Sequence, residues 1–472
     1  MSVGLLGVAG PAAAGSYDPR ADMDSMLNTT AYSGAQAYWK AGFTGKGVDV
    51  AVIDTGVTPV EGLNTPGKVV NGPDLSFESQ RKGLQNLDAN GHGTFMAGLI
   101  AGRDSGLSAP YIDGPASAYR GMAPDARIVN MKVGSADGAV DVSQVIAAID
   151  WVVEHKDDNG LNIRVLTLAY GTDSTQDYRI DPLAHAVERA WNAGIFVAVA
   201  AGNEGYVGDG GKLASPCTDP FILCVGASQS NGTATIGDDL VAPFSAIGNR
   251  RRYVDLVAPG THIQGLRVPG AYIDQKYAEG RLDDRFFRGS GTSEATAIVS
   301  GAAALVIQQR PSITPDELKL LLLRNAQRIG QSLTRQGMGE LNLTAVLNAD
   351  ATQSSWRDAD WREREWRDGD WRDGDLRNGI WRYSNTYRAP STGTGSLEAA
   401  RGSQHVILDG VVLEGEQDIF GHKFDAASRA QAVRYWVGGD WNGNTWSGNT
   451  WSGNTWSGNT WSGNTWSGNT WS

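Results

Sequence analysis

Four residues in this chain have side chains that together could perform nucleophilic catalysis. In chain order they are Asp54, His92, Asn203 and Ser293. A serine hydroxyl is a poor nucleophile by itself, so it needs an imidazole base, and the imidazole needs a carboxylate to orient it. An asparagine amide can stabilise the oxyanion that forms on the attacked carbonyl. The four side chains therefore make a serine peptidase the leading interpretation.

Each of these residues alone also has an ordinary explanation. Asp54 could cap a turn, and Ser293 could be an N-cap, because Gly-Thr-Ser before an apolar helix is common. Aspartic peptidases also use Asp-Thr-Gly, but they need two such lobes, and the sequence has one. His92 differs from the other histidines because it lies between two glycines where a helix is expected to begin. The joint occurrence of the four residues is what favours catalysis.

The pattern of apolar residues from about 40 to 345 predicts the elements that would position these side chains. Continuous apolar runs are typical of parallel strands that are buried on both faces, and helical stripes between them predict covering helices. We expect strands over 48–53, 126–133, 163–169, 195–200, 221–227 and 254–258, and helices from 93, 143, 182, 293 and 314. The predicted fold is a three-layer α/β fold with a mostly parallel sheet. Its active side chains belong at the carboxyl ends of strands, where Asp54 and Asn203 fall.

After about residue 350 the composition changes abruptly. Tryptophan recurs at five-residue spacing over 356–381 and again over 441–471, the second time in a Trp-Ser-Gly-Asn-Thr repeat. A period of five suits neither a strand face nor a helix stripe. We therefore predict a low-complexity, largely disordered tail over 350–472. A ladder of turns that exposes aromatic rings to sugars or a cell-wall polymer is the alternative.

The catalytic domain is predicted over 40–349, after a partial leader and N-terminal extension over 1–39. Residues 1–15 resemble the apolar end of a signal peptide without its positively charged region. The net charge of -12 argues against nucleic acid as the main partner. No stretch reaches the roughly 18 apolar residues that a membrane span needs. We expect a secreted or cell-surface monomer that needs no cofactor.

The two cysteines, Cys217 and Cys224, lie close together in the sequence. A zinc site would need about four ligands, and no second cluster of Cys or His lies nearby, so we expect no metal. A local disulfide is the expectation for an exported protein. Two buried thiols are the alternative.

The four segments resemble the motifs of the subtilisin-like serine peptidases, or subtilases, over roughly residues 40–345. The matching sequences are Val-Ile-Asp-Thr-Gly, Gly-His-Gly-Thr-Phe-Met-Ala-Gly, Ala-Ala-Gly-Asn-Glu-Gly and Gly-Thr-Ser-Glu-Ala-Thr. The order Asp, His, Ser is the order found in subtilisin. The resemblance implies that Ser293 is the nucleophile, His92 its general base and then acid, and Asp54 the orienting carboxylate. The Asn203 amide and the Ser293 backbone N–H would form the oxyanion hole.

The resemblance also implies a binding site for a protein or peptide substrate. Segment 168–171 is similar to the family strand that pairs with an extended peptide by strand addition. The candidate binding residues are Ala169, Tyr170, Gly171, Ala201 and Gly202. Their small side chains predict an open, apolar pocket for the residue before the scissile bond.

The chain departs from the family pattern in three places. Phe95 occupies the place of a second, non-catalytic histidine, Glu294 replaces a usual methionine, and Thr296-Ala297 stands where Pro-His is common. None of these removes a catalytic group. We hypothesise that the carboxylate of Glu294 raises the pKa of His92.

Two other function classes are weaker interpretations. One is a catalytically weak scaffold that binds a cell surface or cell-wall polymer through the Trp-rich tail, but a scaffold has no need of all four catalytic side chains. The other is nucleotide binding, which is disfavoured because no Gly-x-Gly-x-x-Gly follows the first strand.

Overall fold

The computed structural model describes residues 17–205, 211–249, 252–349, 389–408, 411–419 and 421–424. Its centre is a sheet in the order β2-β3-β1-β4-β5-β6-β7, with β8 also paired to β6. These strands are β1 (Asp49–Asp54), β2 (Val69–Asn71), β3 (Arg127–Lys132), β4 (Ile163–Leu168), β5 (Phe196–Ala200), β6 (Leu223–Gln229), β7 (Leu240–Val241) and β8 (Leu256–Pro259). Only the pairing of β6 with β7 is antiparallel among them.

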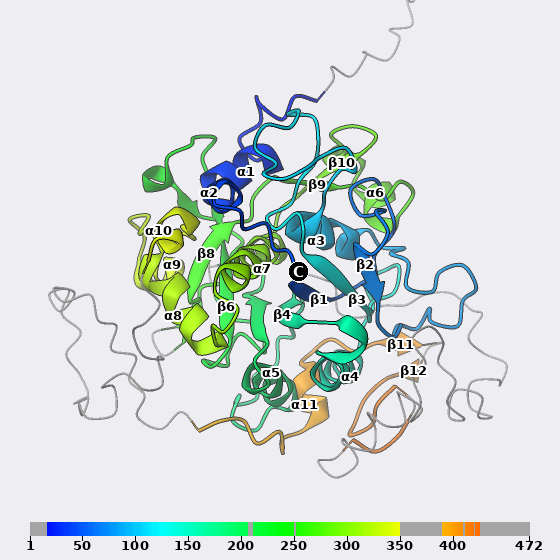
Figure 1. The fold of residues 1–472 in the computed structure, drawn as a ribbon. Helices are drawn as coiled ribbons and strands as arrows, with labels where there is room; N and C mark the ends of the chain where they lie inside the picture. Colours follow the sequence, from blue (N-terminus) through cyan, green and yellow to red (C-terminus); the bar gives the residue numbers. More distant parts are fainter. Residues whose placement is uncertain are drawn as a thin grey trace, which may run out of the picture.

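Helices cover both faces of this sheet (Figure 1). One layer contains α3 (His92–Ala101) and α7 (Thr292–Gln309), which pack on each other, and the other contains α4 (Val142–Glu154) and α5 (Pro182–Asn192). Helix α7 is buried along almost its whole length, and its sequence accordingly has no charged face. The predicted three-layer α/β fold is confirmed.

The other helices are α1 (Met26–Tyr32), α2 (Ala35–Lys40), α6 (Tyr272–Lys276), α8 (Pro315–Asn325), α9 (Leu333–Gln336), α10 (Leu343–Leu347) and α11 (Leu397–Arg401). Two hairpins pair β9 (Ile263–Leu266) with β10 (Phe286–Gly289) and β11 (Ile407–Leu408) with β12 (Val411–Val412). Single 3-10 turns are η1 (Asp158–Gly160), η2 (Ile236–Asp238) and η3 (Ala278–Gly280).

The predicted strands and helices begin within two residues of their observed starts. Two predicted caps explain where helices begin. The side chain of Asp181 accepts hydrogen bonds from the first backbone N–H groups of α5, and Thr314 forms a reciprocal capping box with Glu317 in α8. Local chemistry thus fixes these boundaries before any tertiary contact is considered.

The N-terminal extension predicted over 1–39 packs, in its described residues 17–39, against the rest of the fold. The indole Nε1 of Trp39 donates to the carbonyl of Met122 at 3.0 Å, and Trp39 is fully buried. The backbone N–H of Met26 donates to the side chain of Gln264 at 2.9 Å. The leader predicted at the start of the chain falls on residues 1–16, outside the described residues.

Part of the tail predicted over 350–472 packs against the central fold. Helix α11 packs against α4 and α5, and the orange segment of Figure 1 lies beside both helices. Arg401 is buried, and its Nε lies 2.7 Å from Oδ2 of Asp141. The described residues between 389 and 424 are therefore a docked part of the segment predicted to be largely disordered. Both Trp-rich runs, 356–381 and 441–471, lie outside the described residues.

Cys217 and Cys224 form a disulfide between the loop before β6 and the second residue of that strand, with 5.1 Å between their Cα atoms. Both cysteines are buried. In the parts of the chain that the structure describes, no helix has both the length and the apolar character needed to cross a bilayer.

Replacing both cysteines by alanine should lower the free energy of unfolding by about 2.5 kcal/mol, from the loop-entropy relation for a loop of about eight residues. The measurement is denaturant unfolding of a Ser293→Ala background, which lacks the hydroxyl predicted to be the nucleophile. A reducing agent should destabilise the parent and leave the double variant unchanged. Equal stability of the two proteins without reductant would contradict the prediction.

Candidate active site

The end of β1 and the start of α3 bring Asp54 and His92 together. Nδ1 of His92 lies 2.8 Å from Oδ1 and 2.9 Å from Oδ2 of Asp54. Asp54 is buried at the last position of β1, and His92 is the first residue of α3. A carboxylate at Nδ1 holds the proton on that nitrogen, which leaves Nε2 to act as a base.

Two glycines allow α3 to approach β1 this closely. A Cβ atom at Gly93 would lie 2.2 Å from the carbonyl oxygen of Gly56 and 3.1 Å from Oδ1 of Asp54. Gly91 is the N-cap of α3 and has a φ of 109°, in the region that favours glycine. The glycines on both sides of His92 are thus steric requirements of the Asp54–His92 contact.

A second buried carboxylate, Asp88, fixes the loop that leads into α3. Its Oδ1 accepts hydrogen bonds from the backbone of Gly91 at 2.7 Å and from Oγ1 of Thr55 at 2.8 Å, and its Oδ2 accepts from the backbone of Thr94 at 2.7 Å. Oγ1 of Thr55 in turn accepts from the backbone of Gly93 at 2.9 Å. The sequence reasoning missed Asp88; an Asp-Ala-Asn-Gly run directly before His92 is the turn signal that could have revealed it.

Carboxylates around the imidazole control its charge. Burial disfavours the imidazolium, but Asp54 above all, with Glu294 and Asp88, favours it and raises the pKa of His92 to about 9. Burial also raises the pKa of Glu294, while the positive charge of His92 opposes that rise. The hypothesis that Glu294 raises the pKa of His92 is supported by this arrangement.

Thr292 connects Ser293 to Asn203. The backbone N–H and the Oγ1 of Thr292 donate to Oδ1 of Asn203 at 2.9 and 3.0 Å, and the backbone N–H of Gly202 donates to that same Oγ1 at 3.1 Å. These bonds orient the amide of Asn203, whose Nδ2 is the group that can donate to a ligand. Ser293 is the second residue of α7, where backbone N–H groups have no intrahelical acceptor. Thr292 was not predicted as part of the site.

The helices bring both halves of this arrangement together. Helix α7, which carries Ser293, packs against α3, which carries His92. Glu294 follows Ser293 in the chain and is close enough to act on the charge of His92. The four predicted catalytic residues therefore belong to one region of the fold.

The structure gives a packing reason for two of the departures from the family pattern. A Cβ atom at Gly289 of β10 would lie 2.3 Å from Oε1 of Glu294 and 2.9 Å from Cζ of Phe95. The ring of Phe95 also lies over Gly265 of β9, 2.5 Å from a Cβ atom placed there. Phe95 and Glu294 thus pack side by side against the glycines of the β9–β10 hairpin.

The predicted substrate-binding segments, 169–171 and 201–202, follow β4 and β5, and Ala214 lies between them. A Cβ atom at Gly171 would lie 2.6 Å from Cβ of Ala214, and one at Gly202 would lie 3.3 Å from it. The backbone N–H of Ala214 donates to the carbonyl of Ala201 at 2.9 Å. Ala169 and Tyr170 are buried. Small residues thus meet here, although nothing in the sequence around Ala214 identified it beforehand.

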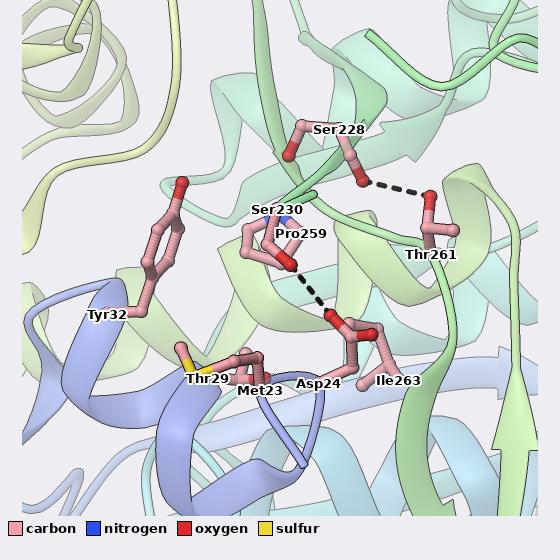
Figure 2. A pocket seen from close by; sticks show the side chains of 9 residues that line it. All are labelled: Met23, Asp24, Thr29, Tyr32, Ser228, Ser230, Pro259, Thr261 and Ile263. Atoms are coloured by element: carbon pink, nitrogen blue, oxygen red, sulfur yellow. Dashed lines mark hydrogen bonds between the residues drawn. The ribbon is translucent and has the colours of Figure 1, made fainter. Parts of the chain in front are cut away.

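A small pocket elsewhere contains none of the predicted site residues. It is lined by Met23, Asp24, Thr29, Tyr32, Ser228, Ser230, Pro259, Thr261 and Ile263. Hydrogen bonds cross it from Ser230 Oγ to Asp24 Oδ1 at 2.9 Å and from Thr261 Oγ1 to the Ser228 carbonyl at 3.1 Å (Figure 2). Among the described residues, no group of three or more His, Cys, Asp or Glu side chains could hold a metal ion.

Comparison with known proteins decides the family. The model of the subtilase family matches residues 45–339. The chain belongs to the subtilase family. It is 40% identical over 285 residues to the serine protease AprX of Bacillus subtilis, which covers 59% of this chain and 61% of AprX. It is 30% identical to the minor extracellular protease Epr of Bacillus subtilis, over 68% of this chain and 41% of Epr.

A shorter relative is subtilisin DY of Bacillus licheniformis, which is 29% identical over 64% of this chain and 92% of that protein. The chain thus spans less than two thirds of AprX and of Epr, and nearly all of subtilisin DY. The resemblance to subtilases predicted from the motifs is confirmed.

Replacing Glu294 by glutamine should lower the pKa of His92 from about 9, because one of the three carboxylates that favour the imidazolium loses its charge. NMR titration of the imidazole in a Ser293→Ala background measures this directly, without relying on activity. Glu279→Gln, on the exposed η3 turn, is the control that should leave the titration in place. An unmoved His92 titration in Glu294→Gln would refute the electrostatic role of Glu294.

Proposed function

We propose that this subtilase is a serine endopeptidase that uses Asp54, His92 and Ser293 as its catalytic triad. The observation that carries the proposal is the contact of Nδ1 of His92 with both carboxylate oxygens of Asp54, within 2.9 Å. Membership of the subtilase family and the similarity to named proteases support the same chemistry.

In the proposed first step, Oγ of Ser293 attacks the carbonyl carbon of the peptide bond, while Nε2 of His92 accepts the hydroxyl proton. Asp54 stabilises the imidazolium that forms. The backbone N–H of Ser293 and Nδ2 of Asn203 donate to the oxyanion. His92 then returns the proton to the departing amine, which leaves an acyl-enzyme.

In the second step, water attacks the ester carbonyl of the acyl-enzyme and His92 accepts the proton of that water. The same two donors stabilise the second oxyanion. When the oxyanion collapses, His92 protonates the Ser293 oxygen, and the carboxylic acid product leaves. The imidazole must be neutral at the start of each step, so activity should rise as the pH rises through the His92 pKa of about 9.

The substrate in this proposal is an extended peptide that adds as a strand to segment 169–171. Strand addition uses main-chain hydrogen bonds, so the affinity depends little on sequence. The close approach of Gly171 and Gly202 to Ala214 supports a pocket with small, uncharged walls for the residue before the scissile bond.

We further propose that the enzyme acts outside the cell or at its surface. The disulfide between Cys217 and Cys224 supports this location, because such bonds persist in oxidising compartments. The name of the relative Epr, an extracellular protease, supports it as well.

An active-site phosphonate should label the full chain at Ser293 and should not label Ser293→Ala. Mass spectrometry of the labelled peptide identifies the modified residue. Ser290→Ala, three residues earlier on an exposed position, should label like the parent. Labelling of Ser293→Ala, or no labelling of the parent, would refute the proposal.

Asn203→Ala should reduce kcat on the order of 10²-fold to 10³-fold, a range measured by removing such a donor from subtilisin itself. KM should change little, because the lost hydrogen bond forms mainly in the transition state. Steady-state kinetics on a peptide substrate test this, with exposed Asn64→Ala as the control. A loss confined to KM would exclude Asn203 as the oxyanion donor.

A further inference from the structure

The described residues between 389 and 424, here called the strap, follow a Trp-rich run in the sequence and yet dock onto the catalytic fold. We propose that the strap positions the substrate-binding segment 169–171 by holding the loop that follows it. The inference rests on the proposed function insofar as segment 169–171 binds substrate.

The strap runs along the whole connection from β4 to α5. The amides of Gln176 and Ser396 bond reciprocally, with the Gln176 side chain donating to the Ser396 carbonyl at 3.1 Å and the Ser396 N–H donating to Oε1 of Gln176 at 2.8 Å. The backbone N–H of Thr392 donates to the carbonyl of Arg179 at 2.8 Å, and that of Gly395 to Ile180 at 2.7 Å. These backbone bonds tie the strap to the turn that precedes α5.

The contact nearest to the substrate-binding segment is made by Thr172. Its Oγ1 donates to the carbonyl of Ala400 at 2.7 Å, and both groups are buried. Thr172 directly follows Gly171, and its backbone exchanges two hydrogen bonds with Ser215, at 3.0 and 2.8 Å. Thr172 is therefore held by the strap through its side chain and by Ser215, the neighbour of Ala214, through its backbone.

Arg401 anchors the strap itself. Its guanidinium lies 2.7 Å from Asp141, the N-cap of α4, and 3.0 Å from Glu398, and it donates to the carbonyls of Gly415 and Gln417 at 2.6 and 2.5 Å. Both members of the Arg401–Asp141 pair are buried. The guanidinium can bind these four acceptors at the same time in only one position. Arg401 therefore sets the register of the strap relative to α4.

A further anchor is made by Ser391, which binds the N-cap and the middle of α5. The backbone N–H of Ser391 donates to both carboxylate oxygens of Glu188, at 2.8 and 3.0 Å, and Oγ of Ser391 donates to the carbonyl of Asp181 at 3.0 Å. The strap is thus fixed at Ser391, which binds Glu188 and Asp181, and at Arg401, which binds Asp141. Ala400, the partner of Thr172, lies between these two anchors in the sequence.

The test uses full-length Thr172→Val, which removes the hydroxyl that reaches Ala400 and keeps the volume of the side chain. We expect KM for a peptide substrate to rise at least threefold while kcat stays within twofold, because ground-state and transition-state binding weaken equally. Thr172→Ser, which keeps the hydroxyl, should behave like the parent. Exposed Arg179→Ala is the control on the same face.

Arg401→Met gives an independent measurement by amide hydrogen exchange in a full-length Ser293→Ala background. We expect faster exchange at residues 169–176 than in the Ser293→Ala parent, and this result does not depend on peptidase activity. Faster exchange in the strap alone, or an unchanged KM in Thr172→Val, would overturn the positioning role. If the parent enzyme failed to react with the phosphonate, the proposed function would fall while the exchange experiment would still decide the placement of segment 169–176.

Discussion

The contact of Asp54 with His92 constrains how β1 and α3 are arranged. The carboxylate can reach Nδ1 only if β1 ends beneath the first turn of α3, and Gly93 provides the necessary space against Gly56. The register of β1 is set by parallel pairing with β3, in which Asp54 lies opposite Lys132. A slip of one residue would turn Asp54 to the other face of the sheet and destroy the contact.

The charge of the His92 imidazole depends on two opposing effects, and the carboxylates outweigh burial, so the charged form is favoured. Burial alone would keep His92 neutral, and three nearby carboxylates oppose that effect. Two of these, Asp88 and Glu294, also have structural roles, since Asp88 binds the loop before α3 and Glu294 packs over Gly289. Charge and packing are therefore linked: a change that relaxes the packing around Glu294 also changes the proton affinity of His92.

Much of this architecture could be predicted because the responsible signals are local. A strand that is buried on both faces must be apolar throughout, so β1 and β5 stand out, and the caps at Asp181 and Thr314 mark helix starts by short-range hydrogen bonds. Thr292 and Ala214 could not be found in this way. Their roles arise from contacts between segments distant in the chain, and neither residue type indicates such a role by itself.

The strap shows the limit most clearly, because its position depends on contacts with residues more than 200 positions earlier in the chain. Composition favoured disorder after residue 350, and the short apolar contribution of Leu397 and Ala400, both fully buried, is too small to identify a docked segment from sequence. A buried ion pair such as Arg401–Asp141 adds little net stability when compared with apolar packing, but leaving Asp141 buried without its partner would be costly. Any other register of the strap would separate Arg401 from Asp141 and is therefore disfavoured. Apolar contacts would tolerate a shift along α4, whereas the directional bonds of Arg401 do not, and this places the Ala400 carbonyl opposite Thr172.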